Sequence, residues 1–193
     1  MKFILASKSP RRIELLRELS LEPQIIPADI NEDDICEDLP EKTVCALSKR
    51  KAQAVAKNYP DALVVAADTL VFKDNALLGK PKDENDARKM LKNLSGTSHS
   101  VFTGFCVAYK GKYALSHTET KVNFRTLSEG EIDDYIATGE PFDKAGAYGI
   151  QGRGKLFVES ISGDYFNIVG LPVCALFELI KKEFGITPEQ LKN

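Results

Sequence analysis

A run of five apolar residues, Leu63 to Ala67, constrains the fold more than any other segment of the chain. The run has the length of a strand, contains no polar residue and is followed directly by Asp68. A strand without alternating polar positions is typical of a sheet that is covered on both faces. The sequence therefore predicts helices flanking a sheet, and it places the carboxylate of Asp68 where the buried strand ends.

The remaining elements are predicted from helical periodicity, capping residues and runs rich in β-branched and aromatic residues. We expect helices from Pro10 to about Ser20, over 41–58, after Asp83, after Ser128 and over 172–184. We expect strands over 3–6, 25–27, 98–109 and 112–124, the last two joined as a hairpin, and a second hairpin from 156–161 and 165–169. Strands and helices alternate early and hairpins dominate late, which predicts an α/β fold with a mixed β-sheet. Since no linker or repeat interrupts the chain, we expect a single domain over residues 1–193.

Composition excludes several classes of function. The 193 residues carry 26 basic and 28 acidic side chains, so the net charge of −2 argues against a surface built to wrap nucleic acid or an anionic membrane. No apolar stretch approaches the roughly 18 to 20 residues that cross a bilayer. The apolar part of the N-terminus is too short for a signal peptide, and we expect a cytoplasmic protein.

The cysteines and histidines give no metal signature. The four cysteines are far apart and form no C-x-x-C pair: Cys36, Cys45, Cys106 and Cys174. Only His99 and His117 could join them around zinc, so a structural zinc site is not expected. We expect reduced thiols, most of them packed as small apolar groups.

Basic and hydroxyl side chains gather at the first predicted turn between strand and helix: Ser7, Lys8, Ser9, Arg11 and Arg12. The N-terminus of a helix presents unpaired backbone N–H groups and a positive dipole end, and guanidinium groups bind oxyanions in bidentate fashion. This pattern favours a polyphosphate ligand. The alternative is a pair of solvated surface arginines.

Acidic residues supply a second candidate feature. Asp68, at the expected carboxyl end of the strand, could hold Mg²⁺ or orient a water, or could simply cap the next turn. The loop with Asp29, Glu32, Asp33 and Asp34 could add a second oxygen ligand, although an acidic run is often a solvated loop.

Lysines and glycines complete the candidate set. Lys51 lies on a predicted helix beside other basic residues that must form its wet face, and Lys80 follows the turn at Gly79. A glycine-rich loop surrounds Gln151, with glycines at 146, 149, 152 and 154. This spacing matches neither a dinucleotide fingerprint nor a P-loop, but it permits close approach of the backbone to a flat ligand.

Seven ordered segments together resemble the Maf family of nucleoside triphosphate pyrophosphatases, also called septum formation inhibitor proteins. The resemblance rests on the segments over 5–16, 48–52, 66–69, 78–81, 94–96, 143–152 and 170–172. It extends nearly from end to end and implies a mixed sheet with flanking helices around a central cleft, similar to inosine triphosphatases, with two lobes in one continuous domain.

The resemblance also implies an activity and a set of residues. The activity is cleavage of a nucleoside triphosphate between the α and β phosphates, with a divalent metal cation, Mg²⁺ or Mn²⁺. Asp68 would be the catalytic base or water-orienting residue, with Glu32 as its partner on the metal. Phosphate binding would fall to Ser7, Arg12, Lys51 and Lys80. A homodimer is a further expectation for the family.

Three positions, Arg11, Thr69 and Gln151, resemble the subgroup of the family that acts on dTTP and UTP. A glutamine carboxamide offers one acceptor and two donors, which can pair with the N3–H and O4 edge that uracil and thymine share. Because cytosine reverses this pattern, its rejection could be worth roughly 1 to 3 kcal/mol for each buried group left unpaired.

Two other functions remain open on sequence alone. The first is a nucleotide-binding regulator of cell division or septum formation in which hydrolysis is incidental. The second is an enzyme that removes deaminated purine triphosphates, which would prefer ITP and have no use for Gln151. The catalytic hypothesis requires the side chains of Arg12 and Asp68 to lie on the same side of the molecule.

Overall fold

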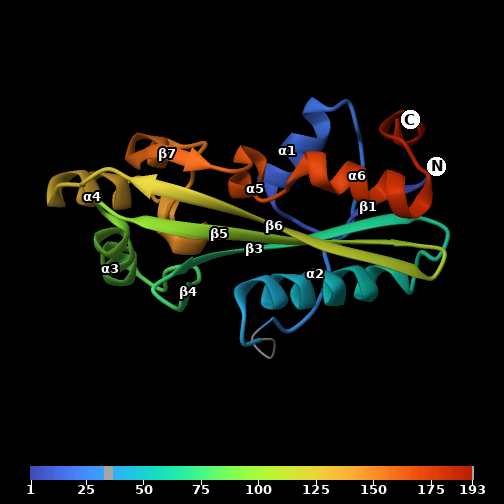
Figure 1. Cartoon of the computed structure of the whole chain (residues 1–193), viewed down its shortest axis with the longest axis horizontal. Helices are drawn as coiled ribbons and strands as arrows, with labels where there is room; N and C mark the ends of the chain where they lie inside the picture. Colours follow the sequence, from blue (N-terminus) through green and yellow to red (C-terminus); the bar gives the residue numbers. More distant parts are fainter. Residues whose placement is uncertain (33–36, 193) are drawn as a thin grey trace. The chain divides into compact units, whose positions relative to one another are not determined.

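The computed structural model describes residues 1–32 and 37–192, and its strands form one mixed sheet (Figure 1). The strands are β1 (Phe3–Leu5), β2 (Gln24–Ile25), β3 (Leu63–Lys73), β4 (Ala76–Leu78), β5 (Ser98–Tyr109), β6 (Lys112–Phe124) and β7 (Val158–Ser162). Among the described residues their order is β2-β1-β3-β5-β6-β7, with β4 paired to β3. β1 runs parallel to β2 and β3, whereas the pairs β3–β4 and β6–β7 are antiparallel. The predicted α/β fold with a mixed sheet is confirmed.

The helices begin and end largely where local chemistry predicts. They are α1 (Pro10–Glu18), α2 (Pro40–Ala56), α3 (Glu84–Leu94), α4 (Glu129–Ile136), α5 (Tyr165–Val169) and α6 (Val173–Phe184), with short 3₁₀ turns at Glu140–Asp143, Ala145–Ala147, Arg153–Phe157 and Pro188–Leu191. The side chain of Asp83 caps α3, a capping box of Ser128 and Glu131 opens α4, and Gly185 ends α6 with φ of 68°. These ends are determined by a few neighbouring residues, which is why the sequence predicts them.

The chain divides into two compact units. The first comprises Met1–Asp68, Thr103–Thr118 and Gly170–Asn193, and the second comprises Thr69–Phe102 and Glu119–Val169. The single domain over residues 1–193 stays a prediction.

In the first unit, α2 covers one face of the sheet (Figure 1). Its Ala52 and Val55 pack against apolar side chains of three strands, namely Ile4, Val64, Ala66, Cys106 and Ala108. Gly104 of β5 permits this contact, because a Cβ there would lie 2.4 Å from the carbonyl carbon and oxygen of Val44. Backbone therefore meets backbone where α2 crosses β5. Figure 1 shows α6 on the opposite side of these strands.

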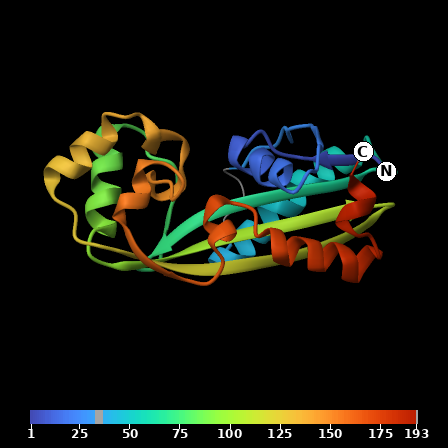
Figure 2. The same ribbon diagram turned by 90° about the horizontal axis from the view of Figure 1, so that it is seen from above.

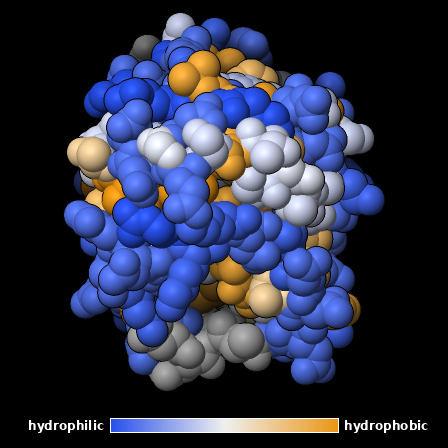
Figure 3. Space-filling model, turned by 90° about the vertical axis from the view of Figure 1, so that its left-hand side faces the viewer, coloured by the Kyte–Doolittle hydropathy of each residue, from blue (hydrophilic) through white to orange (hydrophobic). Residues whose placement is uncertain are grey.

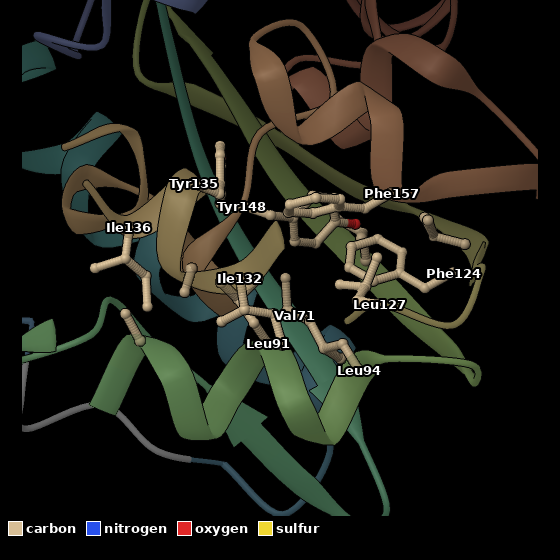
Figure 4. Close-up of a cluster of buried hydrophobic side chains, with 14 residues drawn as sticks. Val71, Leu91, Leu94, Phe124, Leu127, Ile132, Tyr135, Ile136, Tyr148 and Phe157 are labelled. Carbon is tan, nitrogen blue, oxygen red and sulfur yellow. The ribbon is translucent and has the colours of Figure 1, made fainter. Parts of the chain in front are cut away.

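In the second unit, α3 and α4 lie side by side and enclose an apolar cluster (Figures 2 and 4). Leu91 of α3 and Ile132 of α4 contribute to it, and Val71 of β3 lies in the same cluster. Phe124, Tyr148 and Phe157 add aromatic rings packed edge to face, an arrangement favoured by the quadrupoles of the rings. The charged residues of these helices pair at the surface instead, and the face in Figure 3, which looks onto the end carrying α3 and α4, is mainly hydrophilic.

Two predictions about strands are wrong. The strand that begins at Leu63 does not end before Asp68 but continues to Lys73, because β4 pairs with its last three residues. Asp68 therefore lies inside β3 rather than at a strand end.

The predicted second hairpin is also wrong, because residues 165–169 form the helix α5 and β7 pairs with β6 instead. The carboxylate of Asp164 accepts a hydrogen bond from the N–H of Phe166 at 2.8 Å, which satisfies a backbone donor at the start of the helix. The buried side chain of Asn167 then donates to Thr120 Oγ1 at 3.0 Å. A capping side chain and a polar anchor thus override the strand propensity of a five-residue segment.

None of the helices in the described part of the chain has the length and apolar character needed to cross a membrane.

Candidate active site

The turn between β1 and α1 holds Arg12 in place from two directions. Its Nε donates to the carbonyl oxygen of Gly170 at 2.7 Å, and its Nη1 donates to Ser7 Oγ at 3.2 Å. Ser7 Oγ also accepts a hydrogen bond from the N–H of Ser9, at 3.2 Å. Ser9 occupies the N-cap position before Pro10 but makes no capping bond with its own side chain. The hydroxyl and guanidinium groups predicted for this turn are therefore adjacent, with both Ser7 and Arg12 buried.

Lys51 connects two carboxylates. Its Nζ lies 2.6 Å from Asp68 Oδ1 and 3.0 Å from Glu32 Oε1. The side chains of Lys51 and Asp68 are only 11% and 10% exposed, whereas that of Glu32 is 54% exposed. Lys49 and Arg50 on the same helix are exposed, as predicted for its wet face. Lys51 is therefore directed inward among solvated neighbours, and its carboxylate partners compensate the cost of burying its charge.

The same carboxylates act on Arg12. Burial lowers the pKa of the Arg12 guanidinium, while the negative charge of Asp68 raises it; the nearby charge of Arg11 lowers it and that of Glu32 raises it. Asp68 and Glu32 thus lie within electrostatic reach of Arg12. Arg12, Lys51, Asp68 and Glu32, called the charged quartet below, carry two positive and two negative charges.

The donor set of the quartet fits a hard divalent cation. The oxygens of Asp68 and Glu32 already converge on one cationic group, and carboxylate oxygens are the ligands that Mg²⁺ and Mn²⁺ prefer. Among residues 1–32 and 37–192 there is no group of three or more His, Cys, Asp or Glu side chains placed to hold a metal ion. Two carboxylates suffice for Mg²⁺, which commonly takes its other ligands from water and substrate phosphates. Asp33, Asp34 and Cys36 lie outside the described residues.

The glycine-rich loop of the second unit is fixed at two points that flank Gln151. The N–H of Gly149 donates to Tyr135 Oη at 3.2 Å, and the N–H of Arg153 donates to both carboxylate oxygens of Glu140, at 2.9 and 3.2 Å. Gly152 leaves room for this carboxylate, since a Cβ there would lie 2.1 Å from Glu140 Oε2. Gln151, which is half-buried, is therefore presented by a loop with a defined backbone.

Two more candidates belong to the second unit. Lys80 is exposed and follows Gly79, whose carbonyl oxygen accepts a hydrogen bond from the N–H of Gly146 at 3.0 Å. The turn that carries Lys80 is thereby joined to the start of the glycine-rich loop. Thr69 is half-buried in β3, directly after Asp68. The structure thus groups Ser7, Arg11, Arg12, Glu32, Lys51 and Asp68 in the first unit, and Thr69, Lys80 and Gln151 in the second.

Sequence reasoning missed three residues that hold these groups. Gly170 lies in one of the segments that resemble the family, but the sequence predicts no role for it. Its carbonyl contact with Arg12 spans 158 positions of the chain. Its φ of 118° is a conformation that favours glycine. Tyr135 and Glu140, which fix the glycine-rich loop, carry no sequence signal beyond their positions in or after a predicted helix.

Cys45, Cys106 and Cys174 are free thiols.

The fold and the charged quartet define an α/β protein that buries Arg12, Lys51 and Asp68 close together, beside the carboxylate of Glu32. The family described as Maf-like protein matches residues 2–183. A dTTP/UTP pyrophosphatase of Caldanaerobacter subterraneus subsp. tengcongensis is 51% identical over 189 residues, covering 96% of this chain and 91% of the relative. The protein of the same name from Clostridioides difficile is 49% identical and covers 96% and 97%, respectively. That from Aquifex aeolicus is 47% identical and covers 94% and 95%.

The chain belongs to the Maf family. Among solved structures, the Ham1 protein of Staphylococcus aureus is 13% identical, covers 80% of this chain and 90% of its own, and has a TM-score of 0.46. So distant a likeness adds nothing to the family assignment.

Proposed function

We propose that this protein hydrolyses dTTP and UTP to the corresponding monophosphate and pyrophosphate, and thereby removes unwanted pyrimidine nucleotides from the cellular pool. The observation that carries the proposal is the buried ion pair of Lys51 with Asp68, within electrostatic reach of Arg12. The names of three relatives at 47% to 51% identity support the choice of substrates.

Binding of the triphosphate falls to the basic and hydroxyl groups. Ser7 and Arg12 supply an O–H donor and N–H donors at the β1–α1 turn, and Lys51 supplies an ammonium group. Lys80, on its exposed turn, is proposed as a further phosphate ligand. Guanidinium and ammonium groups in a site with little water bind phosphate oxygens more strongly than they would in bulk solvent.

Asp68 is proposed to orient the attacking water. Its carboxylate accepts a hydrogen bond from the water, whose oxygen forms the new bond to the α phosphorus as the bond from that phosphorus to the bridging oxygen breaks. Pyrophosphate leaves, and the proton of the water passes to the carboxylate and then to solvent. Positioning and charge stabilisation supply most of the reduction in the barrier for such a transfer.

Asp68 and Glu32 would hold the divalent cation, Mg²⁺ or Mn²⁺. When bound, the cation would neutralise part of the charge on the triphosphate. Arg11, Thr69 and Gln151 are proposed to select the base, with Gln151 pairing with the N3–H and O4 edge of uracil or thymine. A homodimer and a cytoplasmic location stay predictions from the family resemblance and from composition.

The test is a phosphate-release assay with and without inorganic pyrophosphatase, on a panel of UTP, dTTP, CTP and ITP with Mg²⁺ and with Mn²⁺. We expect release of phosphate from UTP and dTTP only when the coupling enzyme is present, with one UMP or dTMP formed for every two phosphates released. Preference for ITP would favour the purine house-cleaning enzyme. Nucleotide binding without turnover of any triphosphate would favour the cell-division regulator, and either result would refute the proposal.

A further inference from the structure

Lys51 makes contacts that its predicted role in phosphate binding does not explain. Its one ammonium group lies between Asp68 and Glu32, at 2.6 and 3.0 Å from their oxygens. These are the same two carboxylates whose chemistry fits a divalent cation. Lys51 therefore pairs with the oxygens that a metal ion would require.

The exposure of the three side chains indicates how the pairing can be exchanged. Glu32 is 54% exposed, so solvent reaches the arrangement from its side, whereas Lys51 and Asp68 are almost fully enclosed. The ammonium is carried on a flexible four-carbon stem, which allows it to change partners by rotation about its side-chain bonds. An ion that arrives from the side of Glu32 thus meets a cation that can be displaced.

The charges of the quartet supply the driving force. The positive charges of Arg12 and Lys51 are matched by the negative charges of Asp68 and Glu32, which makes the quartet neutral. Without a cation, a triphosphate brought to the quartet would face two carboxylates, and the ammonium group of Lys51 would already be paired with them. A divalent cation on those carboxylates gives the quartet a net positive charge and releases one ammonium group for phosphate oxygens.

We infer that Lys51 is a built-in counter-ion that a divalent cation displaces from Asp68 and Glu32, so that metal binding makes the Lys51 ammonium available to the triphosphate. The inference rests on the proposed function for the identity of the final ligand. Its first step, competition between an ammonium group and a metal ion for two carboxylates, is independent of any nucleotide.

Mn²⁺ binding to the full chain without nucleotide, followed by electron paramagnetic resonance of the free ion, tests the competition directly. Lys51→Met removes the ammonium and keeps most of the volume of the stem, so we expect Mn²⁺ affinity to rise at least about tenfold, equal to about 1.4 kcal/mol. Lys51→Arg keeps the positive charge and should not show this increase. Unchanged or weaker Mn²⁺ binding by Lys51→Met would overturn the inference, since it would mean that Lys51 leaves the metal site undisturbed or only supports its structure.

A matched control removes a different buried lysine. Lys73 is as buried as Lys51, but its Nζ contacts Asn93 and Asp74 instead of the quartet. Lys73→Met should leave Mn²⁺ affinity unchanged, and an equal rise in both variants would refute a specific exchange at Lys51.

Lysine labelling of the wild-type chain provides a measurement that needs no variant. In a short pulse of an acetylating reagent, Mg²⁺ should increase modification of Lys51, as read by mass spectrometry of its peptide, and leave Lys73 unchanged. Protection of Lys51 by Mg²⁺, or no change, would contradict displacement. A chain that passes both tests yet releases no pyrophosphate would refute the proposed function alone, whereas an active enzyme that fails them would refute the inference alone.

Discussion

The first unit buries ionised side chains next to one another, whereas the second buries mainly neutral polar groups. In the first, Arg12, Lys51 and Asp68 are all enclosed. In the second, His99 Nε2 lies 2.8 Å from the hydroxyl of Tyr148 inside the aromatic cluster. The second unit also buries Lys73. Its Nζ donates to the backbone carbonyl and the side-chain oxygen of Asn93 and pairs with the exposed carboxylate of Asp74.

The difference separates stability from function. Buried ion pairs contribute little net stability, because desolvation offsets their attraction. A chain that retains several of them in one place has an arrangement suited to a charged ligand, whereas neutral hydrogen-bonded groups in an apolar cluster are suited to holding a fold. Variants of the quartet should therefore alter turnover, together with the cost of leaving a buried partner unpaired, and variants of the second unit should alter stability or substrate choice.

The largest effect is expected for Asp68→Asn, which keeps the size of the side chain and removes its charge. Because the amide can no longer accept the proton of the attacking water, turnover of UTP should fall at least about 10²-fold. Pyrophosphate release measures this, with the circular dichroism spectrum as the check on folding. Near-normal turnover in a folded variant would remove Asp68 from catalysis.

Gln151→Ala should change substrate choice more than rate. Loss of the carboxamide removes pairing with the uracil edge, so the ratio of kcat/KM for UTP over CTP should fall by about tenfold to a hundredfold. Pyrophosphate should remain the product. An unchanged ratio would exclude Gln151 from base recognition and would weaken the division of roles between the units.

His99 should make stability depend on pH in the second unit. Burial, and to a smaller extent the charge of Lys73, lowers the pKa of His99 from 6.5 to about 4. Well above pH 6.5 the ring is neutral in both states and its contribution is complete. As the pH falls from 6.5 towards 4, the unfolded chain binds a proton that the folded chain does not, so the free energy of unfolding decreases by about 2 kcal/mol by pH 5.

Urea denaturation of wild type and His99→Gln at pH 7 and pH 5 measures this contribution. The variant should lose about 2 kcal/mol less between the two pH values, because it lacks the titrating ring. Equal losses would show that His99 titrates normally in the folded chain.

The smallest effect is expected at Glu140, whose carboxylate accepts the N–H of Arg153 beside the glycine-rich loop. Glu140→Ala should lower the free energy of unfolding by about 1 kcal/mol and reduce the preference for UTP less than Gln151→Ala does. Glu140→Gln keeps an acceptor and should recover part of both losses. If both variants match wild type in denaturation and in substrate preference, the carboxylate does not position the loop.

The sequence predicts those parts of the fold that depend on neighbouring residues. Asp83, Ser128 and Gly185 mark helix ends through local capping, and the hairpin about Lys110-Gly111 follows from a two-residue turn. Residues 165–169 were predicted wrongly because their strand propensity obscures the local capping by Asp164, and because the other contact that fixes the helix, with Thr120, is far away in sequence.

The candidate site was predicted in its residue types more than in its contacts. Asp68 was expected at the end of a strand, but the strand continues, and its pairing with Lys51 allows a carboxylate inside a buried strand. That pairing joins α2 to β3 and cannot be read from spacing. The same is true of the Gly170 carbonyl that holds Arg12.

Gly104 has a consequence for redesign of the enzyme. Lys51 follows Val44 by about two helical turns, so both residues lie on the side of α2 that faces the strands. An added methyl group at Gly104 would push against the Val44 backbone and move the lysine away from Asp68. Mutant libraries aimed at new substrates should therefore keep this position invariant, although it belongs to the contact of β5 with α2 and not to the charged quartet.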